Sequence, residues 1–102
     1  MKKINKLVRD RIPEIIMKKG ETPIVKILDD EQYLIELNKK LKEEVNEYIA
    51  DESIEELADI TEVIYALVEA KGKTIEEFEK IRLDKRENRG AFKDKVYLEY
   101  TK

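Results

Sequence analysis

Two pairs of acidic residues form the clearest chemical pattern in this 102-residue sequence. Glu44 and Glu47 are three positions apart, and so are Glu56 and Asp59. On a helix, this spacing places both side chains of a pair on one face, one turn apart. If two antiparallel helices carry the pairs, four carboxylates meet in one cleft, where they repel one another unless a cation lies among them. The sequence therefore predicts a divalent metal site, and oxygen ligands favour Mg²⁺ or Mn²⁺.

The residue types that the chain lacks exclude several other reaction mechanisms. It contains no cysteine and no histidine, so it has no thiol nucleophile, no thiolate zinc site and no serine–histidine–aspartate triad. Its single serine, Ser53, lies where it can cap a helix. An enzyme of this composition must work with carboxylates, basic side chains and a bound ion.

Composition indicates one folded helical domain over residues 1–102. Charged residues make up 44% of the chain, but hydrophobic residues reach 41%, which is typical of a folded protein. The net charge of −3 argues against binding to nucleic-acid polymers, whose phosphates require a basic surface. No apolar stretch approaches the ~20 residues of a membrane span, and no signal peptide is visible. We therefore expect a soluble, cytoplasmic protein without membrane partners.

Apolar periodicity and capping residues predict four helices. Asp10 would cap the first helix, Ser53 the third and Thr74 the fourth, and Gly90 would end the last one. The second and third helices carry broad apolar faces, more than one short chain can cover, so we expect at least a dimer. The expected ranges are residues 10–20, 30–50, 53–72 and 74–90.

The helical phase of the acidic residues separates them into two classes. At ~100° per residue, Glu44 falls at the border of an apolar stripe and Glu47 one step beyond, whereas Glu43 points towards solvent. Glu56 and Asp59 lie on rows that elsewhere carry packing residues, where an unpaired carboxylate is costly. A capping box with Ser53 would explain Glu56 alone. It would not explain Asp59 or the acidic pair on the facing helix.

Two short segments near the ends of the chain have the alternation of β-strands. Residues 22–28 are rich in β-branched side chains, and residues 95–100 alternate in the same way. A lone strand is not stable, so we expect the two to pair as a small ribbon. The predicted fold class is therefore all-α, with a minor two-stranded β element.

Basic side chains in two segments are candidates for holding phosphates. A charge run is usually a solvated face, and the first segment also reads as a small helix packed on the body. A metal-bound polyphosphate, however, needs cations on the side that the metal does not cover. In the first segment, Lys6, Arg9 and Arg11 could face a phosphate. The candidates for substrate binding are Arg9 and Arg11 near the N-terminus and Lys85, Arg86, Asn88 and Arg89 in the fourth helix.

Together these residues resemble a known enzyme superfamily. Glu43-Glu44-x-x-Glu47 followed by Glu56-x-x-Asp59 is similar to the EExxE…ExxD signature of the all-α nucleoside triphosphate pyrophosphohydrolases. That superfamily includes MazG, dimeric dUTPases and phosphoribosyl-ATP pyrophosphohydrolase. Residues 6–16 resemble the start of small MazG-like proteins, and residues 85–92 resemble their later Asn-Arg-Gly-x-Phe segment. The resemblance extends over nearly the whole chain, although the linker between the acidic pairs is short.

The resemblance implies a MazG-like antiparallel helical bundle that assembles as a homodimer or homotetramer. It implies that Glu44, Glu47, Glu56 and Asp59 bind Mg²⁺. It also implies hydrolysis of a nucleoside triphosphate at the α–β phosphoanhydride to the monophosphate and pyrophosphate, in a role that clears unwanted nucleotides. Glu47 is our first choice for orienting the attacking water, and Glu44 is the other candidate.

Two alternatives stay open at this point. The first is phosphoribosyl-ATP pyrophosphohydrolase of histidine biosynthesis, in which the same bond is cleaved. The second is a non-catalytic helical module that binds a nucleotide or a protein partner.

Overall fold

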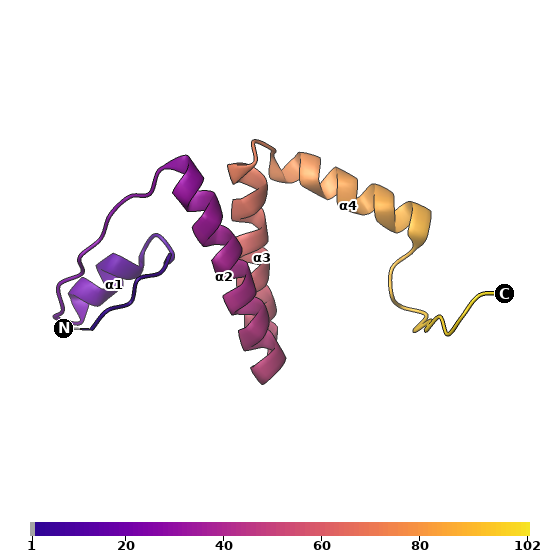
Figure 1. The fold of residues 1–102 in the computed structure, drawn as a ribbon, viewed down its shortest axis with the longest axis horizontal. Helices are drawn as coiled ribbons and strands as arrows, with labels where there is room; N and C mark the ends of the chain where they lie inside the picture. The colour runs from indigo at the N-terminus through magenta and orange to yellow at the C-terminus, as the bar shows by residue number, and fades with distance from the viewer. Residues whose placement is uncertain (1) are drawn as a thin grey trace.

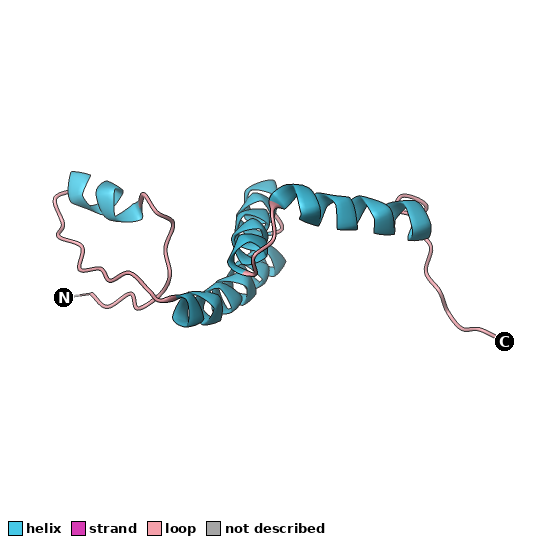
Figure 2. Cartoon of the chain, turned by 90° about the horizontal axis from the view of Figure 1, so that it is seen from above, coloured by secondary structure: helices cyan, strands magenta, loops and turns pink. Residues whose placement is uncertain are grey.

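The structure, a computed structural model, describes residues 2–102, and these form four helices (Figure 1). The predicted all-α class is confirmed, since no segment of the described residues forms a strand (Figure 2). None of the helices in this part of the chain is both long and apolar enough to cross a membrane. The helices are α1 (Ile12–Lys18), α2 (Asp30–Asp51), α3 (Ile54–Ala70) and α4 (Ile75–Arg89).

An antiparallel hairpin of α2 and α3 forms the centre of the molecule (Figure 1). Asp29 caps α2 by accepting a hydrogen bond from the Gln32 backbone N–H at 2.8 Å. The chain reverses at Glu52, whose φ of 55° is the left-handed conformation that ends many helices. Ser53 then caps α3, and its Oγ accepts a hydrogen bond from the backbone N–H of Glu56 at 3.3 Å. The predicted break between these helices is confirmed.

The hydrophobic core occupies the part of the hairpin that lies away from this turn. Leu37, Val63 and Leu67 are its buried side chains. Closer to the turn, the apolar face of the hairpin is open to solvent, with Ile49 65% and Ile54 75% exposed. Partly buried residues surround the core, namely Leu7, Tyr33, Leu34, Leu41 and Ala66.

Helix α4 extends away from the hairpin as an arm (Figure 1). Its N-terminus is a complete capping box, as predicted, because Thr74 and Glu77 each bond the other's backbone N–H at 3.0 Å. The ring of Phe78 meets Tyr65 of α3 edge-to-face, with centroids 6.2 Å apart. No residue of α4 is buried, so this ring contact is a main link between arm and hairpin.

Two sequence predictions differ from the structure. Asp10 does not cap α1. Arg11 occupies the capping position and makes no side-chain hydrogen bond there. Pro13 lies in the first turn, where a backbone N–H would have no acceptor within the helix. The predicted ribbon of residues 22–28 and 95–100 is absent from the described residues. Because α4 carries the C-terminal tail to the far end of the molecule from α1, neither segment has a strand partner (Figures 1 and 2).

The resulting chain is extended. Its radius of gyration is 18.0 Å, whereas a compact domain of ~100 residues has about 13 Å. Large apolar side chains stand in solvent along the tail that follows α4, with Phe92 98% and Tyr97 88% exposed. Isolated exposed apolar residues are common on proteins, whereas here several lie on one segment apart from the core.

Candidate metal centre

Three of the four predicted ligands lie together between α2 and α3. Glu44, Glu56 and Asp59 each offer a carboxylate oxygen within 4.8 Å of the other two. Glu47 belongs to an adjoining group with Glu43 and Glu44 that meets the same limit. Glu44 is shared by both groups, so the two form one acidic centre around it. The hairpin has thus brought the two sequence pairs to the same level.

Glu44 is the most unusual residue of the acidic centre. It is 7% exposed, and among the described residues it is the one buried charged side chain. Its Oε2 atom is buried without a hydrogen-bond partner. Burial raises the pKa of Glu44, and the neighbouring Glu47 carboxyl and the Asp59 charge act in the same direction. A buried carboxylate with an unsatisfied oxygen is costly unless a cation or donor is supplied.

Lys40 partly compensates this charge from one turn earlier on α2. Its Nζ lies 3.3 Å from Glu43 Oε2 and 3.5 Å from Glu44 Oε1. Glu43 also accepts a hydrogen bond from Lys6 at 2.8 Å. These contacts hold the pKa of Glu43 below its usual value, chiefly through the bond from Lys6. Glu43 is therefore a paired residue beside the centre and not the free, solvent-facing carboxylate that the helical phase predicts.

Asp59 is paired with a residue from the N-terminal segment. The Arg9 guanidinium donates from Nη2 to Asp59 Oδ1 at 2.6 Å. The two side chains are 55% and 38% exposed, so water screens much of their attraction. Arg9 nevertheless lies at the acidic centre.

Glu56 has a carboxylate that is available for a ligand. The capping box predicted for α3 forms in one direction, from the Glu56 backbone N–H to Ser53 Oγ. The Glu56 side chain makes no return bond, and its Oε2 is a second buried oxygen without a partner. The structure thus separates the capping role of the Glu56 backbone from the role of its side chain.

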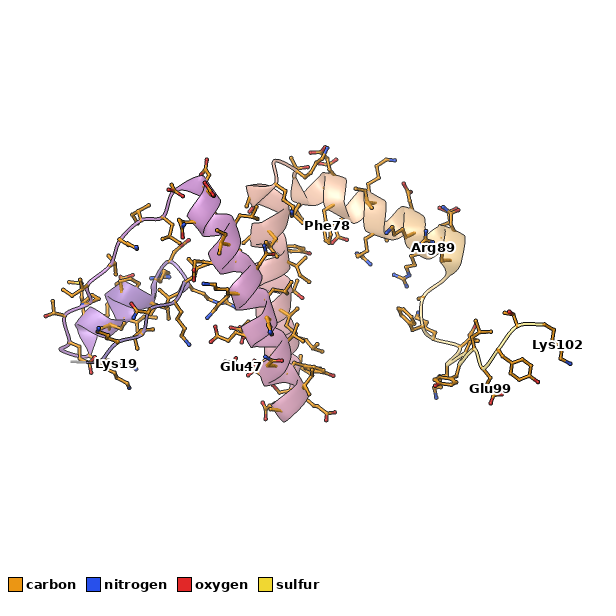
Figure 3. The ribbon with its side chains drawn as sticks, viewed as in Figure 1. Lys19, Glu47, Phe78, Arg89, Glu99 and Lys102 are labelled. Carbon is orange, nitrogen blue, oxygen red and sulfur yellow. The ribbon has the colours of Figure 1, made fainter. Side chains whose placement is uncertain are left out.

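The remaining candidate residues lie elsewhere. Arg11 pairs with Glu14 within α1, at 3.5 Å. The α4 candidates follow at the far end of the arm, whereas Glu56 and Asp59 lie in the first two turns of α3; Figure 3 labels Glu47 on the hairpin and Arg89 on the arm. Within a single chain, the structure does not bring the basic residues of α4, which are Lys85, Arg86, Asn88 and Arg89, to the acidic centre.

Sequence reasoning missed Lys40 as a member of the site, and it predicted Lys6 as a phosphate-facing cation but not as the partner of Glu43. A signal for Lys40 was present, because it precedes Glu44 by four positions, the spacing at which helical side chains meet. Lys6 had no such local signal, since it is 37 positions from Glu43.

The donor set fits a divalent cation. The acidic centre offers carboxylate oxygens from two helices, and two of those oxygens are buried and unpartnered. Oxygen-only ligands without sulfur or imidazole suit Mg²⁺ or Mn²⁺ better than softer metals. An ion here would bind through Glu44, Glu56 and Asp59, with Glu47 adjacent.

Comparisons with known proteins add no assignment. No protein-family model matches the chain, and no solved structure matches it. The chain is similar to an uncharacterized protein of Mycolicibacterium smegmatis (strain ATCC 700084 / mc(2)155), with 54% identity over 41 residues. That match covers 40% of this chain and 42% of the relative, so the likeness is to part of each protein.

Proposed function

We propose that the protein is a Mg²⁺-dependent nucleotide pyrophosphohydrolase with a MazG-like helical arrangement. Its reaction would cleave the α–β phosphoanhydride of a nucleoside triphosphate or related nucleotide, releasing the monophosphate and pyrophosphate. The observation that carries this proposal is the buried Glu44 carboxylate, which has one unpartnered oxygen and forms a close group with the carboxylates of Glu56 and Asp59. The signature spacing of the acidic residues supports the choice of reaction.

The side chains of the acidic centre have distinct roles in this proposal. Glu44, Glu56 and Asp59 hold the ion, which supplies Lewis-acid stabilisation of phosphate oxygens when bound. Glu47 is exposed beside Glu44, so water can reach its carboxylate. Glu47 therefore orients the attacking water and accepts its proton. Attack occurs at the α-phosphorus, and pyrophosphate leaves.

The phosphates also need cationic partners, and a second copy of the chain is the source we propose for some of them. Arg9 already lies at the acidic centre of its own chain. Lys85, Arg86 and Arg89 make no ion pair among the described residues and are carried away on α4. An arm that packs on a neighbouring hairpin would bring these cations to the neighbour's acidic centre.

An apolar groove between α3 and α4 supports self-association as a homodimer or homotetramer. The groove has a volume of about 310 Å³, and Ile64, Val68, Phe78 and Ile81 are among its lining residues. Its continuation along the arm is exposed, and the core of a single chain is small. Small domains with little core are commonly stabilised by oligomerisation.

A nucleotide panel tests the proposed reaction most directly. The full chain would be incubated with each common ribo- and deoxyribonucleoside triphosphate and with phosphoribosyl-ATP, in Mg²⁺ and in excess chelator. We expect Mg²⁺-dependent release of pyrophosphate. Orthophosphate as the primary product would place the attack at the γ-phosphorus and contradict the proposal.

The same panel separates the alternatives. Turnover of phosphoribosyl-ATP alone would assign the protein to the histidine-biosynthesis step. No turnover of any compound would favour a binding module, for which the exposed apolar side chains of the arm already offer a surface.

A further inference from the structure

The residues that precede α1 form a strap across the hairpin, which we define as residues 6–9 and call the N-terminal strap. Lys6 binds Glu43 of α2 at 2.8 Å, and Arg9 binds Asp59 of α3 at 2.6 Å. Between them, Leu7 packs against the hydrophobic core. The strap is therefore anchored by an apolar side chain, while its two cations bind carboxylates on the two different helices of the hairpin.

Arg9 satisfies one carboxylate of the centre but leaves the others incomplete. Its guanidinium contacts Asp59, whereas Glu44 Oε2 and Glu56 Oε2 stay buried without partners. A guanidinium must direct its N–H groups at its acceptors, whereas a small divalent ion can contact oxygens of all three carboxylates at once. An ion and Arg9 would compete for the Asp59 carboxylate, because the guanidinium already donates a hydrogen bond to its Oδ1.

An ion at this centre and the Arg9 guanidinium are like charges that would meet at one carboxylate. Arg9 binds Asp59 Oδ1, and Asp59 also belongs to the group with Glu44 and Glu56 that would hold the ion. Two cations close together repel each other, so an ion bound through Asp59 weakens the bond between Arg9 and that side chain. An arriving anionic phosphate would then attract the guanidinium.

We propose that Arg9 is the resident counter-cation of the acidic centre, that a divalent ion displaces it from Asp59, and that the freed guanidinium then binds a phosphate beside the ion. This inference rests on the metal site of the proposed function. The Arg9 side chain is half exposed, so it can turn away while Leu7 keeps the strap in place. Planar guanidinium groups bind phosphate oxygens in pairs, which suits this second role.

The two roles of Arg9 predict effects of opposite sign. Removing its charge eliminates a competitor for Asp59, so the bare ion should bind more tightly. The same change removes a phosphate partner, so a polyphosphate should bind the ion-loaded protein more weakly. A residue that merely stabilised the fold would shift both affinities in the same direction.

The test uses the full chain and the variants Arg9→Gln, Arg9→Lys and Arg11→Gln. Binding of Mn²⁺ is measured by electron paramagnetic resonance, and binding of inorganic tripolyphosphate is measured by calorimetry at saturating Mn²⁺. For Arg9→Gln we expect Mn²⁺ affinity to rise about two- to fivefold, the range set by an exposed ion pair. We expect its affinity for tripolyphosphate to fall at least about fivefold, because a charge-assisted bond is lost.

Two variants serve as controls. Arg11 pairs with Glu14 in α1 and not with the centre, so Arg11→Gln should change neither affinity. Arg9→Lys keeps the positive charge that competes for Asp59 but loses the planar guanidinium that binds two phosphate oxygens at once. It should bind Mn²⁺ like the unaltered protein and bind tripolyphosphate more weakly.

The outcomes distinguish this inference from the function on which it rests. If the unaltered protein binds Mn²⁺ and releases pyrophosphate, but Arg9→Gln binds Mn²⁺ equally or more weakly, the role of Arg9 is wrong and the proposed function stands. If the unaltered protein binds no Mn²⁺ at millimolar concentration, both are overturned. Circular dichroism and melting temperature establish that each variant is folded before its affinities are compared.

Discussion

Two regions of the molecule differ in packing. One is the hairpin of α2 and α3, and the other is the arm formed by α4 and the tail that follows it. The hairpin buries Leu37, Val63 and Leu67 and holds the acidic centre between its helices. The arm buries no residue, and the apolar side chains after it stand in solvent. Both regions nevertheless have well-defined helix ends, with Ser53 and Thr74 as caps.

This difference shows that local signals can specify a helix without specifying what the helix packs against. The capping box at Thr74 and the stop at Gly90 depend on neighbours in sequence. The hairpin gains further stability from packing, which is the main source of helical stability in proteins. The arm lacks this contribution within its own chain. Under the proposed self-association, a second copy would supply the surface on which the arm packs.

The largest effect is expected for a substitution in the acidic centre of the hairpin. Glu44→Gln should lower kcat/KM for pyrophosphate release at least about 100-fold, beyond the ~10–100-fold typical of losing an outer partner of a metal ligand. Glu62→Gln is the matched control, because Glu62 lies on the exposed side of the same hairpin and should be nearly neutral. Equal losses in the two variants would mean that catalysis does not depend on the acidic centre.

Stability measurements by urea denaturation sharpen the contrast in packing. Leu67→Ala should cost ~2–5 kcal/mol, because Leu67 is buried in the hairpin core. Phe92→Ala should change the unfolding free energy by less than about 0.5 kcal/mol at low protein concentration. At high concentration, Phe92→Ala should become destabilising and should weaken self-association in sedimentation. A large cost at low concentration would mean that the tail packs on its own hairpin.

The pH dependence of stability without metal tests the buried carboxylate. The pKa of Glu44 is raised above its ordinary value of 4.5, mainly by burial, so the folded protein binds this proton more tightly than the unfolded chain. Its contribution should therefore increase stability as the pH falls from neutral through the raised pKa, and become constant below the ordinary value. Glu44→Gln should remove this increase in thermal melts. An unchanged profile would show that Glu44 is not desolvated.

The smallest effect is expected for Asp59→Asn without metal. The change relieves repulsion with Glu44 but also weakens the exposed pair with Arg9, so the unfolding free energy should change by less than about 1 kcal/mol. The variant should, however, lose most of the rise in melting temperature that Mg²⁺ gives the unaltered protein. A larger loss without metal would make the Asp59–Arg9 pair structural and would remove a ligand from the acidic centre.

The sequence predicted the features of this molecule that depend on spacing along a helix. The starts of α3 and α4 and the end of α4 follow caps and a glycine that act over three or four residues. The grouping of Glu44, Glu56 and Asp59 followed from two pairs with helical spacing and a short turn between them. Helical phase placed Glu44 at the border of the apolar stripe, where the structure buries it, but it wrongly predicted Glu43 as a free, solvent-facing carboxylate.

Contacts between segments that are distant in the sequence could not be predicted from the sequence. The pairing of Arg9 with Asp59 joins residues 50 positions apart, and nothing local to either one specifies the other. The ribbon prediction failed for the same reason, since strand alternation shows that a segment can pair but not whether its partner is near. The direction of α4 depends on the joint after α3, where Tyr65 meets Phe78, and no periodicity encodes that angle.

The two-residue turn at Glu52 and Ser53 has a consequence for how the protein reaches its native state. Because a two-residue turn joins α2 and α3, only a short loop must close before the helices pack, and small helical domains fold in microseconds to milliseconds. The hairpin should thus form in a rapid phase that is independent of protein concentration. Docking of the arm on a second copy would follow as a slower, second-order step. Each newly made chain would then possess its acidic centre before it meets a partner.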